Sequence, residues 1–337
     1  MSGKNIFCTI TNKNRSEQPL HMKKYIAIFP ILIVSVGLSQ RVPIDAVILK
    51  QTFVYAVKND SALALDVYTM KDADRAVKKP AILFMFGGAF VTGRRDDTIY
   101  NAYFNSLTEN NNVVISISYR LGLRGVQHVS KFNIKPFKNA VDMAVADVYD
   151  ATNWTFRHAD SLGIDTSMII LSGSSSGAIT TLTAEFEREN EYAAATTLPA
   201  GFEYAGLITF SGAILSLKGK LTYKNPPAPR LMFHGTEDKI VPYQKIRFFN
   251  RGFYGSGWIA KYLKTHNIPY YLYSEEGMGH EIAVLPMIDK LPFILDFLDD
   301  YILQHQPYQI ELNFKNPEQK PLMLQTSSEL IKKLNQP

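Results

Sequence analysis

The chain has 337 residues, 46% of them hydrophobic and 20% charged, which is enough to build a sizeable core and too apolar for a disordered chain. Its formal net charge is +5, but residues 1–39 hold five Lys or Arg side chains against Glu17 alone. The rest of the chain is therefore almost neutral, which argues against nucleic acid as a partner. The single cysteine, Cys8, lies in this leader, so the remainder has no thiol for a disulfide or a metal thiolate.

A secretory signal peptide is predicted over residues 22–39. Two lysines precede an apolar run at 25–36, and small residues follow up to Ser39, where we expect cleavage. The run is short for a bilayer span, so no stable membrane span is expected after removal. Residues 1–21 fit no targeting pattern. The leader predicts a secreted or periplasmic protein; a buried first helix and an uncleaved anchor are the alternatives.

After the leader, short apolar runs alternate with helical patterns. Strands are expected at residues 51–57, 62–69, 81–86, 113–119, 168–172, 205–211, 230–234 and 270–274, and helices at 98–109, 137–160, 176–189, 243–264 and 286–304. The first two strands alternate in polarity, as in an antiparallel hairpin, whereas the later ones are continuously apolar, as in strands buried on both faces. The alternation predicts one α/β domain over residues 45–304, with a mostly parallel eight-stranded sheet, helices on both faces and a minimal cap. Residues 305–337 are polar and proline-containing, and are expected to form a C-terminal tail.

A candidate nucleophile stands where one predicted strand ends and a helix begins. Gly173-Ser174-Ser175-Ser176-Gly177 fits G-x-S-x-G, the nucleophile elbow. The central residue of this turn projects above the sheet, and bulky residues two positions away would collide with neighbouring elements. The pattern therefore selects Ser175 among four nearby serines. An ordinary serine-rich helix cap is the alternative.

A serine nucleophile needs a base, and the base needs an acid that fixes its tautomer. In this architecture the chain order is serine, acid, histidine. Asp238 follows a predicted strand and precedes an apolar-Pro closure, and His280 follows the last predicted strand between two glycines. Glu237 is the alternative acid, and His234 is expected to order the acid loop by hydrogen bonding.

The tetrahedral intermediate also needs hydrogen-bond donors for its oxyanion. A glycine pair follows the strand at 81–86, so the amides of Gly88 and Ala89 can converge with that of Ser176, the residue after the nucleophile. A plain strand-ending turn is the alternative. Without a usable cysteine or an HExxH pattern, no metal site and no cofactor are expected.

These motifs resemble those of the α/β-hydrolases, and more narrowly the carboxylesterase branch related to hormone-sensitive lipase and to bacterial feruloyl and acetyl-xylan esterase-like proteins. The resemblance covers about residues 45–304 and rests on "FGGAFVTG", "ISYRLG", Asp147 through Trp154, "GIDTSMIILSGSSSGA", "HGTEDKIVP" and "GMGHE". It implies Ser175 as nucleophile, Asp238 as acid, His280 as base, and Gly88, Ala89 and Ser176 as oxyanion donors. The His-Gly-Gly motif of the family begins here with Phe86, which can brace the turn only by packing.

The expected reaction is ester hydrolysis through an acyl-enzyme, on a small or carbohydrate-linked ester. Residues 120–138 and 245–258 are expected to line the pocket, and the aromatics of the second segment fit either a substrate ring or a packed helix face. Two other functions are considered. A prolyl-oligopeptidase-like peptidase normally needs a large amino-terminal propeller, for which there is no room here. A non-catalytic binding protein on a hydrolase scaffold is disfavoured by the complete set of triad side chains.

Overall fold

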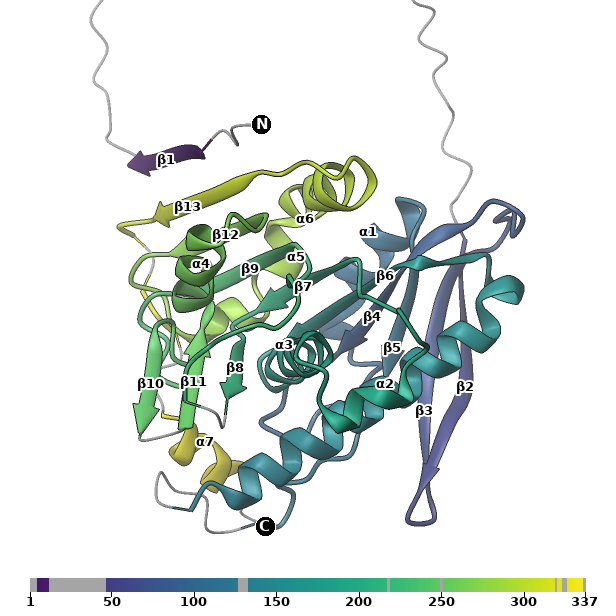
Figure 1. Cartoon of the computed structure of the whole chain (residues 1–337), viewed down its shortest axis with the longest axis horizontal. Coiled ribbons are helices and arrows are strands. Elements are labelled where there is room, and N and C mark those ends of the chain that lie inside the picture. Colours follow the sequence, from purple (N-terminus) through teal and green to yellow (C-terminus); the bar gives the residue numbers. More distant parts are fainter. Residues whose placement is uncertain are drawn as a thin grey trace, which may run out of the picture.

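The computed structural model describes residues 5–11, 47–126, 133–216, 219–248, 251–318, 320–322 and 326–335, so the predicted signal peptide lies outside the described residues. The main sheet has the strand order β1-β13-β12-β9-β7-β6-β4-β5-β3-β2 (Figure 1). The strands are β1 (Asn5–Thr11), β2 (Ile48–Lys58), β3 (Ser61–Met70), β4 (Lys79–Met85), β5 (Val113–Ile117), β6 (Ile164–Ser174), β7 (Gly206–Phe210), β9 (Arg230–Gly235), β12 (Tyr270–Glu275) and β13 (Gln309–Lys315).

All eight predicted strands are present in this sheet, but the predicted number of eight is wrong. The sheet has ten strands, because β13 pairs in parallel with β12, and β1 pairs with β13. β13 lies in the segment expected to be a tail. Its sequence, QIELNFK, alternates apolar and polar residues and is only partly buried, which is typical of a strand near a sheet edge.

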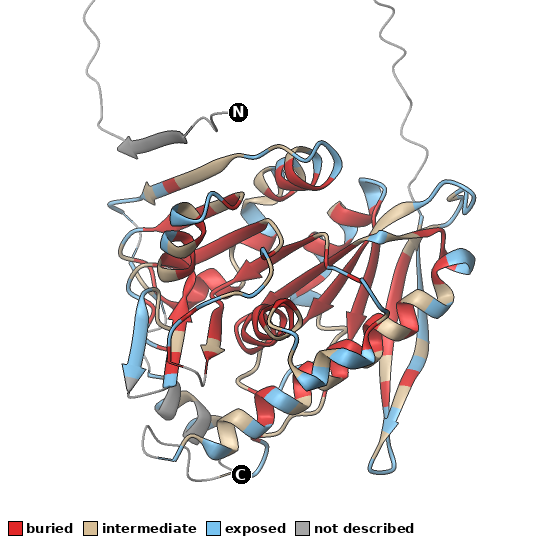
Figure 2. Ribbon diagram, viewed as in Figure 1, coloured by how far each residue is buried: buried red, intermediate tan, exposed pale blue. Residues whose placement is uncertain are grey.

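The sheet is parallel except at one edge. β2 pairs antiparallel with β3, and β3 pairs antiparallel with β5, whereas the neighbouring strands from β5 to β13 are parallel. Every residue of β5 and β7 is buried, which agrees with their unbroken apolar sequences (Figure 2). The carboxyl ends of the parallel strands consequently meet at one rim of the fold.

Helices cover both faces of the sheet (Figure 1). On one face α1 contacts α5 and α6, and on the other α2 packs against α3. The helices are α1 (Asn101–Glu109), α2 (Lys135–Leu162), α3 (Ser176–Glu189), α4 (Ser256–Thr265), α5 (Pro286–Asp289), α6 (Leu291–Phe297) and α7 (Ser327–Leu334), with single turns η1 (Thr98–Tyr100), η2 (Ala193–Thr197), η3 (His280–Ala283) and η4 (Leu298–Leu303). None of the helices in the described ranges is both long and apolar enough to cross a bilayer.

The predicted helix at 243–264 is wrong in its first half. Residues there form two strands of a second sheet, in the order β10-β11-β8, with β8 (Ala213–Ser216), β10 (Lys245–Phe248) and β11 (Arg251–Gly255), and the helix α4 begins only at Ser256. Gly255 explains the difference, because a Cβ added there would lie 1.7 Å from the carbonyl oxygen of Pro242. Close contact with the loop after β9 therefore decides the backbone path here, and this contact is not visible in local sequence.

Candidate active site

Ser175 occupies a strained turn between β6 and α3. Its φ of 50° and ψ of −116° lie outside the usual regions for a non-glycine residue, and its amide donates to the carbonyl oxygen of Phe210 at 2.8 Å. A Cβ on Gly173 would lie 2.5 Å from the Gly177 carbonyl carbon, and one on Gly177 would lie 2.2 Å from the Met85 oxygen. Both glycines are therefore required sterically, as the G-x-S-x-G spacing predicts.

Three predicted side chains meet at the carboxyl rim of the sheet. Ser175 Oγ lies 2.7 Å from Nε2 of His280, and Nδ1 of His280 lies 2.7 Å from Oδ2 of Asp238. All three residues are buried. Since the Asp238 carboxylate only accepts, Nδ1 carries the proton and the Nε2 lone pair faces the serine hydroxyl, the arrangement that a general base requires.

The acid loop holds the Asp238 carboxylate in a fixed orientation. Its Oδ1 accepts from the amides of Ile240 at 2.8 Å and Val241 at 2.9 Å. Burial alone would raise the pKa of the Asp238 carboxyl, but hydrogen bonds from His234 and His280 outweigh burial and hold this pKa well below its usual range. The carboxyl group is therefore ionised at neutral pH.

The two neighbours that competed with these residues in the sequence have other surroundings. Glu237 is exposed, and the residue whose carboxylate meets the imidazole is Asp238. His234 is fully buried, with Nε2 3.0 Å from the Val241 carbonyl oxygen and Nδ1 2.8 Å from Ser256 Oγ. His234 thus ties the acid loop to the start of α4, in agreement with the expectation that it orders this loop.

The serines on either side of Ser175 make structural contacts. Ser174 Oγ donates to the carbonyl oxygen of Ala283 at 2.8 Å, which connects the elbow to the turn that carries His280. Ser176 Oγ lies 3.1 Å from the hydroxyl of Tyr119, which in turn donates to the Phe86 carbonyl oxygen at 2.9 Å. Tyr119 was not singled out in the sequence, since a tyrosine that ends an apolar strand carries no distinctive local signal.

The predicted oxyanion residues form a tight turn after β4. Gly88 has a φ of 137°, and its carbonyl accepts from the amides of Val91 at 2.9 Å and Thr92 at 3.1 Å. The next residue, Ala89, has a φ of 56°. Among the described residues, the amides of Gly88, Ala89 and Ser176 have no acceptor, so these three N–H groups remain available to a ligand.

Phe86 supports this turn by packing, as its replacement of a histidine requires. Its ring lies 4.5 Å, centroid to centroid, from that of Tyr119. A Cβ on Gly93 would lie 2.6 Å from the Phe86 ring and 2.3 Å from the Gly87 carbonyl oxygen. The loop therefore closes tightly over the phenylalanine.

An aromatic row leads away from the oxyanion turn. Phe90 makes an edge-to-face contact with Phe137 at 5.7 Å, and Phe137 makes another with Phe253 at 5.9 Å. Phe90 is buried, whereas Phe137 and Phe253 are half-buried. The row joins the two segments that were expected to line the pocket, of which residues 127–132 and 249–250 lie outside the described residues.

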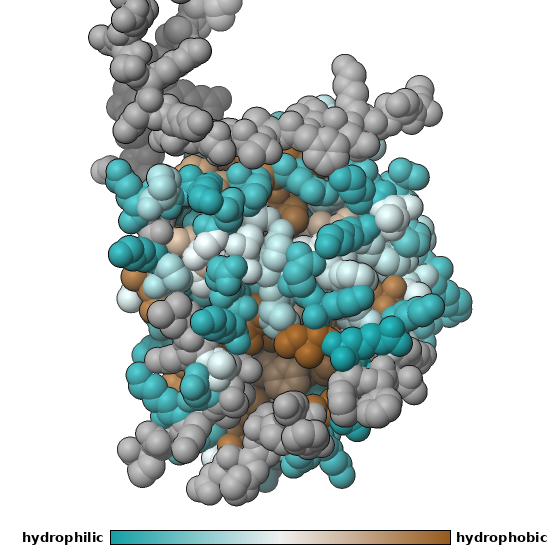
Figure 3. All heavy atoms as spheres, turned by 90° about the vertical axis from the view of Figure 1, so that its left-hand side faces the viewer, coloured by the Kyte–Doolittle hydropathy of each residue, from teal (hydrophilic) through white to brown (hydrophobic). Residues whose placement is uncertain are grey.

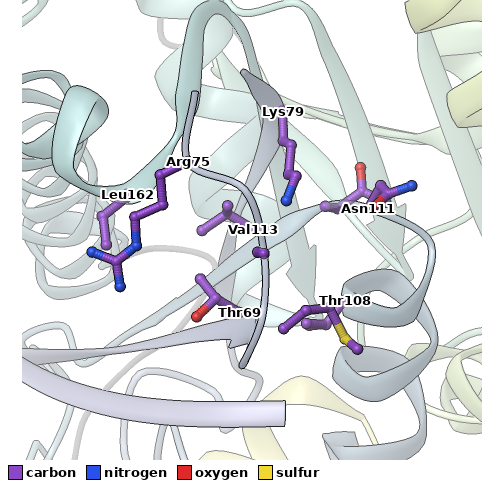
Figure 4. A pocket seen from close by; sticks show the side chains of 10 residues that line it. Thr69, Arg75, Lys79, Thr108, Asn111, Val113 and Leu162 are labelled. Carbon is purple, nitrogen blue, oxygen red and sulfur yellow. The ribbon is translucent and has the colours of Figure 1, made fainter. Parts of the chain in front are cut away.

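A separate pocket lies at the opposite rim. It is lined by residues at the start of β4 and β5, including Lys79 and Val113, together with Thr69, Arg75 and Leu162 (Figure 4). The pocket lies at the amino ends of β4 and β5, whereas Ser175 follows the carboxyl end of the parallel strand β6, so this pocket is not part of the triad site. Within the described part of the chain, no group of three or more His, Cys, Asp or Glu side chains is arranged for a metal ion.

Part of the chain matches a known sequence family, and shorter stretches match two curated proteins. A sequence model described as the carboxylesterase family matches residues 37–188. The cAMP-regulated D2 protein of Dictyostelium discoideum is 29% identical over 39% of this chain and 23% of its own length, and acetylcholinesterase 1 of Caenorhabditis briggsae is 26% identical over 36% and 18%. The chain thus spans less than a quarter of the length of these two curated relatives.

Solved structures match over much more of the fold. Thermogutta terrifontis esterase 2, in a form phosphorylated by paraoxon, has a TM-score of 0.55 and 21% identity, covering 74% of this chain and 93% of that one. Its propionate-bound form gives a TM-score of 0.56 at 21% identity, with the same two coverages. Likeness at this identity establishes the fold, and the narrower branch related to hormone-sensitive lipase stays a prediction. The chain therefore has the α/β-hydrolase fold.

Proposed function

We propose that the chain is a serine hydrolase that cleaves carboxylic esters through an acyl-enzyme intermediate. The observation that carries the proposal is the connected line from Ser175 Oγ through His280 to Asp238, with 2.7 Å at both contacts. The carboxylesterase match at 37–188 includes Ser175 and the oxyanion turn, and the Thermogutta terrifontis neighbour is an esterase; both support the proposal.

The geometry permits a complete cycle without another group. His280 Nε2 takes the proton of Ser175 as Oγ bonds to the ester carbonyl carbon, and the amides of Gly88, Ala89 and Ser176 hold the oxyanion. His280 then gives that proton to the leaving alcohol, while Asp238 stabilises the imidazolium. A water molecule attacks the acyl-enzyme with His280 again as base, which releases the carboxylic acid and restores Ser175.

We further propose a small ester as the substrate, with a carbohydrate-linked ester as the preferred natural class. The half-buried rings of Phe137 and Phe253 continue from the oxyanion turn and offer flat apolar surface to an acyl group or a sugar. Propionate, the ligand named for the Thermogutta neighbour, is a short acid, which supports a short acyl group here.

A substrate panel tests this proposal: p-nitrophenyl acetate, butyrate and octanoate, methyl ferulate and acetylated xylan. Ser175→Ala should abolish hydrolysis, whereas Ser167→Ala, at an exposed position on the same strand, should keep it. Activity that survives Ser175→Ala would refute the nucleophile. Cleavage of amides without esters would indicate a peptidase, and glycan binding without any hydrolysis would indicate a non-catalytic scaffold.

We also propose that residues 22–39 direct export and are removed after Ser39. Support comes from the two lysines, the apolar run and the small residues of that segment. Intact-mass measurement of protein recovered from the medium or periplasm should give a chain that begins at Gln40 and therefore lacks β1. A retained leader in the exported protein, or protein confined to the cytoplasm, would overturn this assignment.

A further inference from the structure

The C-terminal segment, residues 326–335, contacts a loop near the candidate active site. This segment contains the helix α7 and ends at Asn335, the residue directly after that helix. Asn335 Oδ1 accepts a hydrogen bond from the Gly125 amide at 2.7 Å. Its Nδ2 donates to the carbonyl oxygens of Leu123 at 3.1 Å and Val126 at 3.2 Å. One side chain, more than 200 positions away in sequence, thus satisfies three backbone groups of the loop at 121–126.

The loop at 121–126 in turn holds the oxyanion turn. The amide of Leu123 donates to the Phe90 carbonyl oxygen at 2.9 Å, and Nε of Arg124 donates to the Val91 carbonyl oxygen at 3.1 Å. Phe90 and Val91 directly follow Gly88 and Ala89. The contacts therefore run without interruption from Asn335 to the residues that present the candidate oxyanion amides.

The oxyanion turn needs such outside support. Ala89 and Phe90 both have positive φ angles, 56° and 60°, which side-chain-bearing L residues avoid. Two consecutive residues of this kind persist only where the surrounding structure fixes them. The bonds from Leu123 and Arg124 reach the turn where this strain is stored.

Two leucines of the segment pack against the rest of the fold. Hydrogen bonds from Thr326 lower the pKa of the Glu329 carboxyl, and the positive charge of Lys239, next to Asp238, lowers it further. Leu330 and Leu334 pack against the hydrophobic core. Figure 3 shows apolar side chains gathered around a hollow in the lower half of one face of the molecule. The segment is therefore held by this packing as well as by the hydrogen bonds of Asn335.

We propose that residues 326–335 act as a built-in clasp on the active site, with Asn335 as a positioning residue for the amides of Gly88 and Ala89. The clasp rests on the proposed esterase function. Asn335 touches no reacting atom; it fixes the loop at 121–126, which fixes the strained turn. A chain without this contact would retain the triad and present its oxyanion donors less accurately.

The test uses the full chain with Asn335→Ala, and Asn316→Ala as the matched control. Asn316 is an exposed asparagine in the same C-terminal region, and its Oδ1 accepts a hydrogen bond from the Glu318 amide within its own turn. Removing one oxyanion donor typically lowers kcat about 100- to 1,000-fold, so displacing two donors without removing them should lower kcat on p-nitrophenyl acetate at least about 10-fold. KM and the melting temperature should stay close to those of the unaltered chain, and inactivation by paraoxon, which also places charge on an oxygen, should slow by the same factor as kcat.

Two more variants separate the clasp from a general loss of structure. Asn335→Asp keeps an acceptor for the Gly125 amide but loses both donors, so it should be impaired at least as much as Asn335→Ala. A chain that ends at residue 325 should show the same loss of kcat. Amide hydrogen exchange in peptides that cover 86–93 and 121–126 should accelerate in all three variants and remain unchanged in Asn316→Ala.

The results distinguish failure of the clasp from failure of the proposed esterase function. Unchanged kcat and paraoxon rate in Asn335→Ala would overturn the clasp and leave the esterase function intact. The clasp would also be overturned if the exchange rates of these two loops in Asn335→Ala equalled those of the unaltered chain. If the unaltered chain neither hydrolyses esters nor reacts with paraoxon, the proposed function fails, and the exchange measurement still decides whether Asn335 holds the turn.

Discussion

Replacing Asp238 by asparagine is expected to trap His280 in the wrong tautomer. Oδ1 of Asp238 accepts from two backbone amides, those of Ile240 at 2.8 Å and Val241 at 2.9 Å. In the variant, the carboxamide NH₂ cannot take this position, because it would face two other donors. His280 can move its proton to the other ring nitrogen, whereas the backbone amides cannot, so the NH₂ replaces Oδ2, which lies 2.7 Å from His280 Nδ1 and 3.4 Å from His234 Nε2.

This orientation of the carboxamide changes which ring nitrogen of His280 carries the proton. Nδ1 of His280 becomes an acceptor, so its proton moves to Nε2, which then faces Ser175 Oγ and cannot accept the serine proton. A tautomer error of this kind in a serine-histidine-aspartate site lowers kcat about 10⁴-fold, which corresponds to about 5.4 kcal/mol of activation free energy. The acid loop should remain ordered, because its carbonyl acceptor for Ile240 and Val241 is retained.

Steady-state hydrolysis of p-nitrophenyl acetate measures this effect, with Glu237→Gln as the matched control at the adjacent exposed carboxylate. We expect the control to keep the original kcat and Asp238→Asn to lose about four orders of magnitude without a large change in KM. A kcat for Asp238→Asn within about tenfold of the original would refute the tautomer argument. Rates of paraoxon inactivation should fall in parallel, since they use the same base.

Three other changes follow from buried contacts. Gly177→Ala places a Cβ 2.2 Å from the Met85 carbonyl oxygen and should lower the free energy of unfolding by about 1–3 kcal/mol or more, measured by urea titration. Burial raises the pKa of Glu187 to about 7, so the folded chain keeps a proton that the unfolded chain releases near 4.5, and the free energy of unfolding should fall as pH rises between these values. Glu187→Gln should make this slope shallower, and Glu189, whose pKa burial also raises to about 7, should supply the rest. Arg230→Met leaves the fully buried Glu185 carboxylate without its charged partner and should lower the free energy of unfolding by about 3–5 kcal/mol. Adding Glu185→Leu should make this loss smaller, because no buried charge then remains.

Most of the candidate site could be predicted because its residues lie within short sequence motifs. The steric need for Gly173 and Gly177 is local, so the elbow could be located from spacing alone. Asp238 and His280 follow apolar strands, and parallel topology brings strand ends to one rim without any knowledge of side-chain contacts. The later six of the eight predicted strands were recognisable because burial on both faces demands continuous apolar sequence, and the first two because they alternate in polarity.

The errors lie where distant contacts decide local structure. The stretch 245–255 reads as part of a helix, but its pairing with β8 and the closeness of Gly255 to Pro242 make it a hairpin. The sequence of β13 was interpreted as a tail because a strand near a sheet edge needs apolar residues at fewer positions. Asn335 gives no signal at all, because its importance depends on three backbone groups of a loop more than 200 residues earlier.

The buried pair of Glu185 and Arg230 explains why the triad is assembled before any substrate binds. Glu185 lies on α3, the helix that begins immediately after Ser175, and Arg230 begins β9, the strand that leads to Asp238. Their 2.8 Å contact joins the nucleophile helix to the acid strand, with both side chains fully buried. Breaking a buried pair of this kind strands one charge in the interior, so relative motion of the two elements is strongly opposed. The distance between Ser175 and Asp238 is therefore fixed by the resting fold, and His280 needs only to occupy the gap between them.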